Sequence, residues 1–141
     1  RAICDIYHFK KINHTSGHQC GDEVLKKLVS SISEVIRADT DWLARYGGVE
    51  FLIVLPETQL RNASGMAERL RKNIAKNAIE TQEHKIPITA SFGVTGFNSA
   101  IPPTNITSDA LIHLADKYLY AAKNQGRNQV VSGAFKGSND P

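Results

Sequence analysis

The sequence predicts an α/β fold of the α+β type, with a mixed, partly antiparallel central sheet flanked by helices on one face or both. Three observations lead to this prediction. Apolar residues recur at three- and four-residue spacing in three stretches, as they do in amphipathic helices. Short apolar or β-branched stretches alternate with these helices, as strands do. Two such strands surround Gly47 and Gly48, whose turn chemistry indicates an antiparallel hairpin.

The first half of the chain is expected to form a strand, a helix and the hairpin. Residues 1–7 are an apolar run interrupted by Asp5, and a polar turn follows over residues 8–21. Asp22 has the chemistry of a helix N-cap. The apolar stripe of the helix that follows consists of Val24, Leu25, Leu28, Val29, Ile32, Val35 and Ile36. The hairpin strands are residues 43–46 and 51–55, and Pro56 ends the second one.

The second half is expected to form a helix, a strand, a helix and a last short strand. The stripe of the first of these helices consists of Leu60, Ala63, Ala67, Leu70 and Ile74. Residues 86–95 alternate and are β-branched, which predicts one strand, and residues 96–107 form a loop. Ser108 caps the last helix, Gly126 closes it, and Val130 begins the last strand. The stripe of that helix consists of Leu111, Leu114, Ala115, Tyr118, Leu119 and Ala122.

Length and composition indicate one globular domain, which we expect over residues 1–135, with a polar tail over 136–141. The net charge is +3, and the cations are interspersed with acids, which indicates a solvated surface and no nucleic-acid footprint. Two cysteines are too few for a disulfide framework, so a reducing cytoplasm is expected. No apolar stretch approaches the roughly 20 residues of a membrane span. Because residue 1 already lies in a predicted strand, a sensor or membrane anchor is expected outside this chain.

Three polar regions indicate a candidate site, namely the first strand with the turn after it, the hairpin tip and the end of the last helix, and each also has a purely structural explanation. Asp5 lies within an apolar run, where a charge should bind a cation or be hydrogen-bonded at a strand end. Lys10 and Lys11 follow the strand, where backbone N–H groups can also cradle phosphates. The paired glycines of the hairpin allow close approach of another group, or only a tight turn. Arg127 follows the last helix, where it can hold phosphate bidentately or complement the helix dipole.

Five segments, in this order along the chain, resemble the motifs of the GGDEF domain of bacterial diguanylate cyclases. Residues 5–13 (DIYHFKKIN) resemble D-x-D-x-F-K-x-x-N, and residues 17–25 (GHQCGDEVL) resemble G-H-x-x-G-D-x-x-L. Residues 45–51 (RYGGVEF) resemble the signature R-Y-G-G-[DE]-E-F. Residues 90–94 (ASFGV) contain S-[IF]-G-V, and residues 115–128 resemble A-D-x-x-[LM]-Y-x-A-K-x-x-G-R-N.

The resemblance implies a fold like that of nucleotidyl cyclases and polymerase palms, and the joining of two GTP molecules into cyclic di-GMP. It implies that Asp5 and Glu50 are catalytic and that Asp5 and the backbone carbonyl of Ile6 bind Mg²⁺ or Mn²⁺. The implied substrate-binding residues are Phe9, Lys10, Asn13, Asp22, Gly47, Gly48, Lys123 and Arg127. Asn13 and Asp22 would bind guanine, whereas the backbone at Phe9 and the three cations would bind phosphates.

The resemblance also implies partners and a location. GTP is the expected ligand, and a homodimer through the active-site face is the expected assembly. An attached sensor or phosphodiesterase domain would lie outside this chain. The expected location is the cytoplasm, or the cytoplasmic part of a membrane-anchored protein.

The signature departs from the family at Val49, where the family has an Asp or Glu that binds metal. Valine has no lone pair to offer, and loss of one electrostatic stabiliser costs about 10²–10³ in rate. Glu50 is not expected simply to replace it, because neighbours along a strand point to opposite faces, although a hairpin tip loosens that rule. Tyr7 replaces the second Asp of D-x-D. The product-inhibition motif R-x-x-D is not intact either, because Arg37 and Asp41 are one residue too far apart.

Three functions follow from this pattern. The first is a GTP-binding regulatory domain with weak or lost cyclase activity. The second is an active diguanylate cyclase that uses Asp5 and Glu50. The third is a non-catalytic dimerisation or interaction module, which would have no need of the retained residues Asn13, Asp22 and Arg127.

Overall fold

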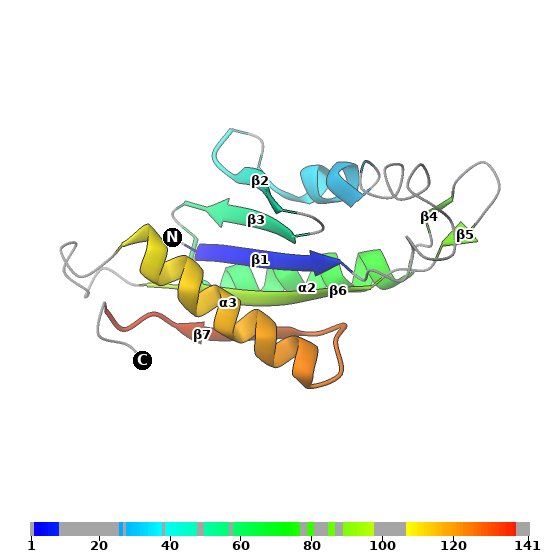
Figure 1. Cartoon of the computed structure of the whole chain (residues 1–141). Coiled ribbons are helices and arrows are strands. Elements are labelled where there is room, and N and C mark those ends of the chain that lie inside the picture. The colour runs from blue at the N-terminus through cyan, green and yellow to red at the C-terminus, as the bar shows by residue number, and fades with distance from the viewer. Residues whose placement is uncertain are drawn as a thin grey trace.

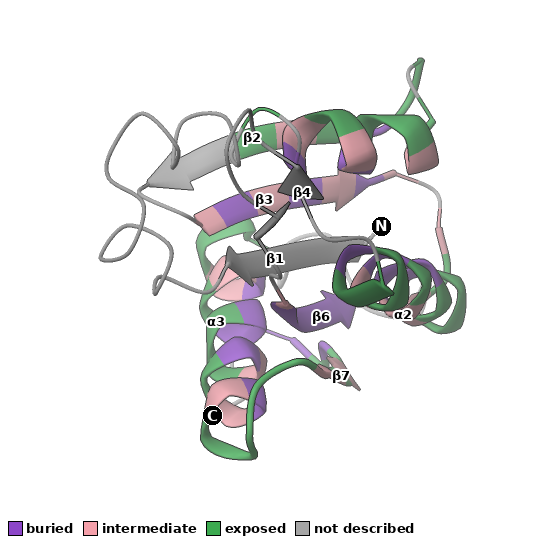
Figure 2. Ribbon diagram, turned by 90° about the vertical axis from the view of Figure 1, so that its right-hand side faces the viewer, coloured by how far each residue is buried: buried purple, intermediate pink, exposed green. Residues whose placement is uncertain are grey.

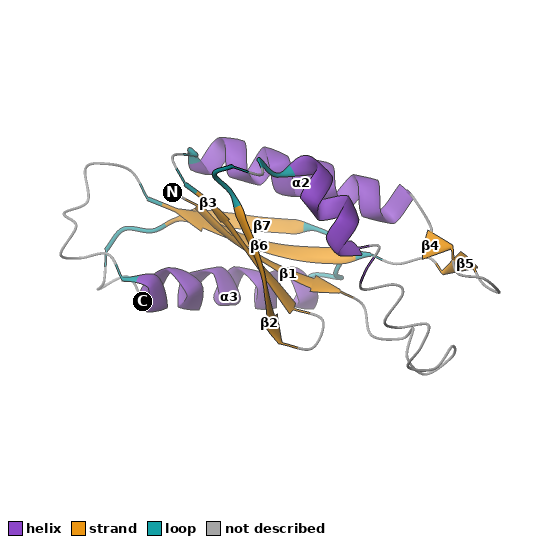
Figure 3. Cartoon of the chain, turned by 90° about the horizontal axis from the view of Figure 1, so that it is seen from above, coloured by secondary structure: helices purple, strands orange, loops and turns teal. Residues whose placement is uncertain are grey.

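The computed structural model describes residues 2–8, 26, 28–37, 39–47, 50–56, 58–76, 79–80, 85–86, 89–97 and 107–137. They form a five-stranded sheet of strand order β2-β3-β1-β6-β7 with helices on both faces, and a small two-stranded sheet (Figures 1 and 3). The predicted mixed fold class is therefore confirmed. The elements are β1 Ala2–His8, β2 Trp42–Gly47, β3 Glu50–Leu55, α2 Leu60–Lys76, β4 Ile79–Glu80, β5 Lys85–Ile86, β6 Ala90–Gly96, α3 Ser108–Asn124 and β7 Val130–Ala134.

Strand β1 lies at the centre of the main sheet and pairs antiparallel with β3 and with β6. The predicted hairpin is confirmed, because β2 pairs antiparallel with β3, with a register shift between Arg45 and Gly47. Strand β7 runs parallel to β6, which makes the sheet mixed. The central position of β1 explains why its sequence is a nearly continuous apolar run.

The main core fills the space between one face of the sheet and two helical segments, α2 and the helical stretch 28–35. Strand β3 alternates buried and half-buried residues, as expected for a strand with one face in the core. Figure 2 shows the buried sides of α2 and α3 turned toward the sheet. The fully buried side chains of this core include Leu28, Ile32, Phe51, Ile53, Leu55, Leu70, Phe92 and Val94.

Helix α3 covers the opposite face of the sheet (Figure 3). It lies directly against β6 at Gly93. A Cβ atom on Gly93 would stand 2.1 Å from the carbonyl oxygen of Ala115 and 2.4 Å from the backbone nitrogen of Leu119. Only glycine permits this close approach. The cluster beneath the first half of α3 consists of Leu111, Leu114, Ala115 and Phe135.

Two predicted boundaries were wrong. Residues 86–95 do not form one strand, because Ile86 belongs to the small β4–β5 hairpin and Thr89 lies outside any strand. The sequence has Pro87 between them, and proline cannot donate a ladder hydrogen bond. The N-cap of α3 is Thr107 and not Ser108, since the Thr107 hydroxyl accepts a hydrogen bond from the backbone N–H of Ala110 at 3.1 Å.

The remaining elements agree in type and order with the prediction where the structure describes them, although strand ends differ by a residue, as at Gly96, which was predicted in a loop and ends β6. Residues 28–35 are helical, although the predicted cap Asp22 lies outside the described residues. Helix α3 ends before Gly126, whose φ of 115° suits glycine. Within the described part of the chain, none of the helices has the length and apolar character needed to cross a bilayer.

The contact at Gly93 gives the first prediction. Gly93→Ala should lower the free energy of unfolding by about 1–3 kcal/mol or more, because the new methyl overlaps the backbone of α3. The matched control is Gly65→Ala in the exposed face of α2, where a Cβ meets nothing within 4 Å. That substitution should stabilise the protein by about 0.5–1 kcal/mol. Urea denaturation measures both, and equal effects of the two substitutions would contradict this account of the α3–β6 contact.

Candidate functional site

The predicted site residues divide into those that the structure describes and those that it does not. Asp5 and Ile6 lie in β1, Gly47 ends β2, and Glu50 begins β3. Lys123 lies in the last turn of α3, and Arg127 follows that helix. The predicted residues outside the described part of the chain are Phe9, Lys10, Asn13, Asp22 and Gly48, and Val49 is also outside it.

The register of the sheet brings the described residues to one end of one face. Tyr7 lies opposite both Glu50 on β3 and Ser91 on β6, and we call these three residues the Glu50 row. Asp5 lies two residues earlier on β1, opposite Leu52 and Gly93. Directly opposed residues, and residues two apart on a strand, share a face. Asp5 and Glu50 therefore occupy the same face, the one that α3 covers at Gly93.

The last turn of α3 reaches the Glu50 row. The ammonium nitrogen of Lys123 lies 4.0 Å from a carboxylate oxygen of Glu50, with 21% and 36% of the two side chains exposed. A lysine in the last turn of a helix is also stabilised by the helix dipole. An ion pair at this distance and exposure contributes little to stability. What it shows is that the start of β3 and the last turn of α3 lie side by side.

The turn between α3 and β7 has an unusual backbone. The N–H of Arg127 donates to the carbonyl of Ala122 at 2.9 Å, and that of Gly126 donates to the carbonyl of Lys123 at 3.4 Å. This is the Schellman closure of a helix. After it, Arg127 and Asn128 keep positive φ angles of 63° and 49°. Residues other than glycine rarely adopt such angles, so hydrogen bonds from outside the turn must hold it.

Two residues that the sequence did not predict as site residues hold Asn128, and a third, Glu68, holds one of them. The hydroxyl of Ser91, in the Glu50 row, accepts from the backbone N–H of Asn128 at 3.0 Å. The guanidinium of Arg71, on α2, donates to the side-chain oxygen of Asn128 at 3.0 Å and to its carbonyl at 3.3 Å. The other edge of that guanidinium donates to both carboxylate oxygens of Glu68. In the sequence, Glu68 and Arg71 appear only as two opposite charges three residues apart, which is common on helix surfaces. Nothing in that spacing indicates the contact with Asn128.

The charges of this pair stabilise each other. Hydrogen bonds from Arg71, opposed by burial and aided by the charges of Arg71 and Lys72, hold the pKa of Glu68 below its ordinary value. The hydrogen bonds from Glu68 likewise raise the pKa of Arg71, against the effect of burial. Both groups therefore stay ionised at neutral pH, and Arg71 remains a donor to Asn128.

Two acidic residues at this end of the sheet are of a type that suits a hard divalent cation. In the sheet register Asp5 and Glu50 belong to neighbouring strands, and Mg²⁺ prefers oxygen ligands. Among the side chains that the structure describes, no group of three or more His, Cys, Asp or Glu residues comes together. A cation here would need further oxygens from the backbone, such as the Ile6 carbonyl, or from a bound phosphate.

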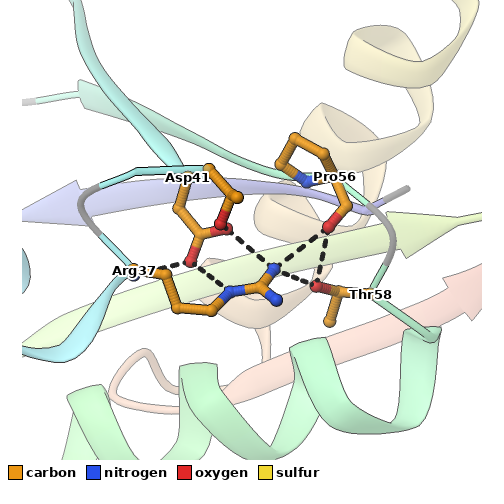
Figure 4. Close-up of polar contacts among 5 residues, drawn as sticks. Arg37, Asp41, Pro56 and Thr58 are labelled. Carbon is orange, nitrogen blue, oxygen red and sulfur yellow. Dashed lines mark hydrogen bonds and ion pairs between the residues drawn. The ribbon is translucent and has the colours of Figure 1, made fainter.

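Arg37 and Asp41, the residues of the altered R-x-x-D string, bind each other (Figure 4). The Arg37 side chain donates to the two Asp41 oxygens at 2.9 and 3.2 Å, and its backbone N–H donates at 2.7 Å. The same guanidinium donates to the Pro56 carbonyl at 3.0 Å and to the Thr58 hydroxyl at 2.8 Å. Arg37 thus connects the end of the helical stretch 28–35 with the segment that leads into α2.

Asp41 is buried within this set of contacts, and its side chain has 0% exposure. Burial alone would raise the pKa of Asp41. The hydrogen bonds from the side chain and backbone of Arg37, together with its charge, outweigh burial and hold that pKa below its ordinary value.

Comparison with known proteins identifies the class to which this fold and site belong. The sequence profile described as "Diguanylate cyclase, GGDEF domain" matches residues 2–129. The chain belongs to the GGDEF family of diguanylate cyclase domains, which confirms the resemblance found in the sequence.

Individual relatives agree with this assignment. The chain is 43% identical over 132 residues to the probable diguanylate cyclase DgcT of Escherichia coli, covering 92% of this chain and 28% of that protein. It is 39% identical over 134 residues to the response regulator PleD of Caulobacter vibrioides, covering 94% of this chain and 28% of that protein. The chain therefore spans less than a third of the length of these two relatives.

Solved structures show the same palm-like fold. The active GGEEF domain of a diguanylate cyclase from Vibrio cholerae superposes with a TM-score of 0.80 at 32% identity, covering 93% of this chain and 81% of that one. The GGDEF domain of PA1120 from Pseudomonas aeruginosa superposes with a TM-score of 0.83 at 26% identity, covering 96% and 83%.

The buried carboxylate of Asp41 gives the second prediction. Asp41→Asn should lower the free energy of unfolding at pH 7 by about 1–3 kcal/mol, because Arg37 loses a charged acceptor. Since the folded-state pKa of Asp41 is depressed, its contribution is complete above the ordinary value of 3.8 and is lost as the pH falls through the folded-state value. The difference between wild type and variant, followed by denaturation from pH 7 downward, should therefore shrink below about pH 4. Asp39→Asn, on the exposed part of the same turn, is the control and should show no such difference.

Proposed function

We propose that this chain is a GTP-binding domain of the GGDEF family in which the condensation of two GTP molecules to cyclic di-GMP is slow or lost. GTP would then act as a regulatory ligand of the whole protein. The observation that carries the proposal is Val49, an apolar residue at the third position of an otherwise retained signature. The residues expected to bind nucleotide are kept, and one expected metal ligand is absent.

The comparison with the Vibrio cholerae domain supports this reading of Val49. That domain is named as an active GGEEF domain, so its third signature residue is a glutamate. This chain has valine there, which offers no oxygen to a metal ion. A missing electrostatic stabiliser lowers the rate of a reaction by about 10²–10³, and a missing metal ligand should cost at least that.

The geometry of α3 supports retained nucleotide binding. Lys123 reaches the Glu50 row, and Arg127 stands on the neighbouring turn beyond the same helix. Two cations at one end of the sheet suit a triphosphate, and an arginine can bind phosphate oxygens bidentately. In this proposal Lys123 and Arg127 bind and orient the phosphates, with Lys10 and the backbone at Phe9. Asn13 and Asp22 bind the guanine.

Mg²⁺ or Mn²⁺ would be held by Asp5 and the carbonyl of Ile6, with Glu50 on the same face. When bound, such an ion activates a ribose hydroxyl and offsets the charge that develops on the α-phosphate. Gly47 and Gly48 would let the nucleotide approach the hairpin backbone closely. A productive reaction also needs a second copy of the domain facing the first, because each copy would hold one GTP.

One observation favours the alternative, an active cyclase that uses Asp5 and Glu50. It is supported by the sheet register, in which Asp5 and Glu50 belong to neighbouring strands and occupy positions two residues apart. Glu50 therefore starts from the correct face to take over as a metal ligand. In the described structure its carboxylate lies beside Lys123, and it would have to leave that ion pair to do so.

Activity measurements give the third prediction and test the proposal. Wild-type protein with GTP and Mg²⁺ should form little or no cyclic di-GMP, and Val49→Glu should raise the rate by about 10²-fold or more by restoring a carboxylate. The matched control is Val49→Gln, because glutamine has the shape of glutamate without its charge. This variant should stay inactive. Product formation by wild type at a rate like that of Val49→Glu would show that Glu50 suffices and that the alternative is correct.

Nucleotide affinity gives the fourth prediction. Lys123→Met should weaken GTP binding about tenfold or more, because a charge-assisted hydrogen bond to phosphate is lost. Lys117→Met, on the exposed side of the same helix, should leave the affinity unchanged. Calorimetric titration of GTP measures both. If wild type binds no GTP, the chain is a non-catalytic interaction module and the proposed function is wrong.

A further inference from the structure

We propose that Arg71 is a positioning residue for Arg127, which it holds in a phosphate-binding orientation through the turn that follows α3. Arg71 lies on α2, on the other face of the sheet from α3, and is not part of any motif that the sequence presented. The inference rests on the proposed function in one respect, namely that Arg127 binds phosphate. The hold of Arg71 on the turn can be tested without nucleotide.

The first step is that the turn needs external support. Gly126, Arg127 and Asn128 have φ angles of 115°, 63° and 49° in succession. Glycine adopts such an angle without strain and asparagine tolerates it, but arginine does so at a cost of roughly 1 kcal/mol or more. A strained backbone persists only where neighbouring contacts fix it. Arg127, the residue expected to bind phosphate, is thus the most strained residue of this turn.

The second step is that the support comes from Arg71. Its guanidinium donates to both the side-chain oxygen and the carbonyl of Asn128, at 3.0 and 3.3 Å. The backbone N–H of Asn128 donates in turn to the Ser91 hydroxyl at 3.0 Å. Asn128 is therefore fixed from α2 on one side and from β6 on the other. Gln129 adds contacts within the turn, because its side-chain amide donates to the carbonyls of Gln125 and Arg127 at 3.0 and 3.2 Å.

The third step is that Arg71 is itself held rigidly. Both oxygens of Glu68 accept from its other edge, and 18% of the Arg71 side chain is exposed. A planar guanidinium can serve Glu68 and Asn128 at once, whereas a lysine ammonium on its flexible stem cannot reproduce this geometry. An exposed i,i+3 ion pair by itself contributes only a few tenths of a kcal/mol. The contact with Asn128 is what joins the Glu68–Arg71 pair to the turn that carries Arg127.

The experiment is a double-substitution cycle on GTP affinity. Arg71→Ala and Arg127→Ala should each weaken binding about tenfold or more, since each removes charge-assisted hydrogen bonds from the site or its support. Because Arg71 acts through Arg127, the double variant should bind no more weakly than Arg127→Ala alone. If the loss of GTP affinity in the double variant equals the product of the two single losses, Arg71 acts independently of Arg127, and the inference is overturned.

Two further variants separate positioning from charge. Arg71→Lys keeps the positive charge and loses the two-sided geometry, so it should bind GTP as weakly as Arg71→Ala. Wild-type affinity in Arg71→Lys would show that Arg71 attracts the nucleotide only by its charge, and the inference would fail. Arg61→Ala removes an exposed cation from the other end of α2 and should bind like wild type.

Amide hydrogen exchange without nucleotide tests the support of the turn itself. In Arg71→Ala the amide of Asn128 should exchange at least about tenfold faster, while amides in the middle of α3 keep their protection. Unchanged exchange at Asn128, or lost protection throughout α3, would overturn the inference. If wild type binds no GTP, the proposed function fails, and this exchange experiment still decides whether Arg71 holds the turn.

Discussion

The close approach of α3 to β6 at Gly93 is the constraint on which the candidate site depends. The helix backbone lies where a side chain would otherwise be, since a Cβ on Gly93 would stand 2.1 Å from a carbonyl of α3. This contact seats α3 directly over the face that carries Asp5 and the Glu50 row. In the last turn of the helix, the ammonium nitrogen of Lys123 lies 4.0 Å from a carboxylate oxygen of Glu50. A helix held one side-chain layer farther from the sheet could not make this pair.

Sequence patterns predicted the elements whose periodicity extends over many residues. The stripes of α2 and α3 and the hairpin around Gly47 were recovered in the structure. The β4–β5 hairpin was missed because strands of two residues carry no period. Ile86 was wrongly assigned to the following strand because β-branched residues continue on the other side of Pro87. Thr107 and Ser108 can both cap a helix, and only the geometry of the Ala110 amide distinguishes them.

Motifs in the sequence name candidate site residues, but they do not show contacts between distant segments. The resemblance named Asp5, Glu50, Lys123 and Arg127, whose roles stay predictions; the structure adds that Asp5 and Glu50 lie on neighbouring strands and that Lys123 lies beside Glu50. The role of Arg71 could not be found in this way. Its partner Asn128 lies on another element far along the chain, and within α2 the residue reads as half of an ordinary helical ion pair.

Arg127 takes its described hydrogen-bonded support from α2 and β6 and not from the β2–β3 hairpin, and this makes a binding domain without turnover physically reasonable. Arg127 depends on α2 and β6 through Arg71 and Ser91, and Lys123 depends on the seat of α3. In the proposed function, valine at position 49 removes one expected metal ligand, whereas Arg127 keeps its hydrogen-bonded support from α2 and β6. Evolution can then retain GTP binding as a signal after the chemistry has been lost.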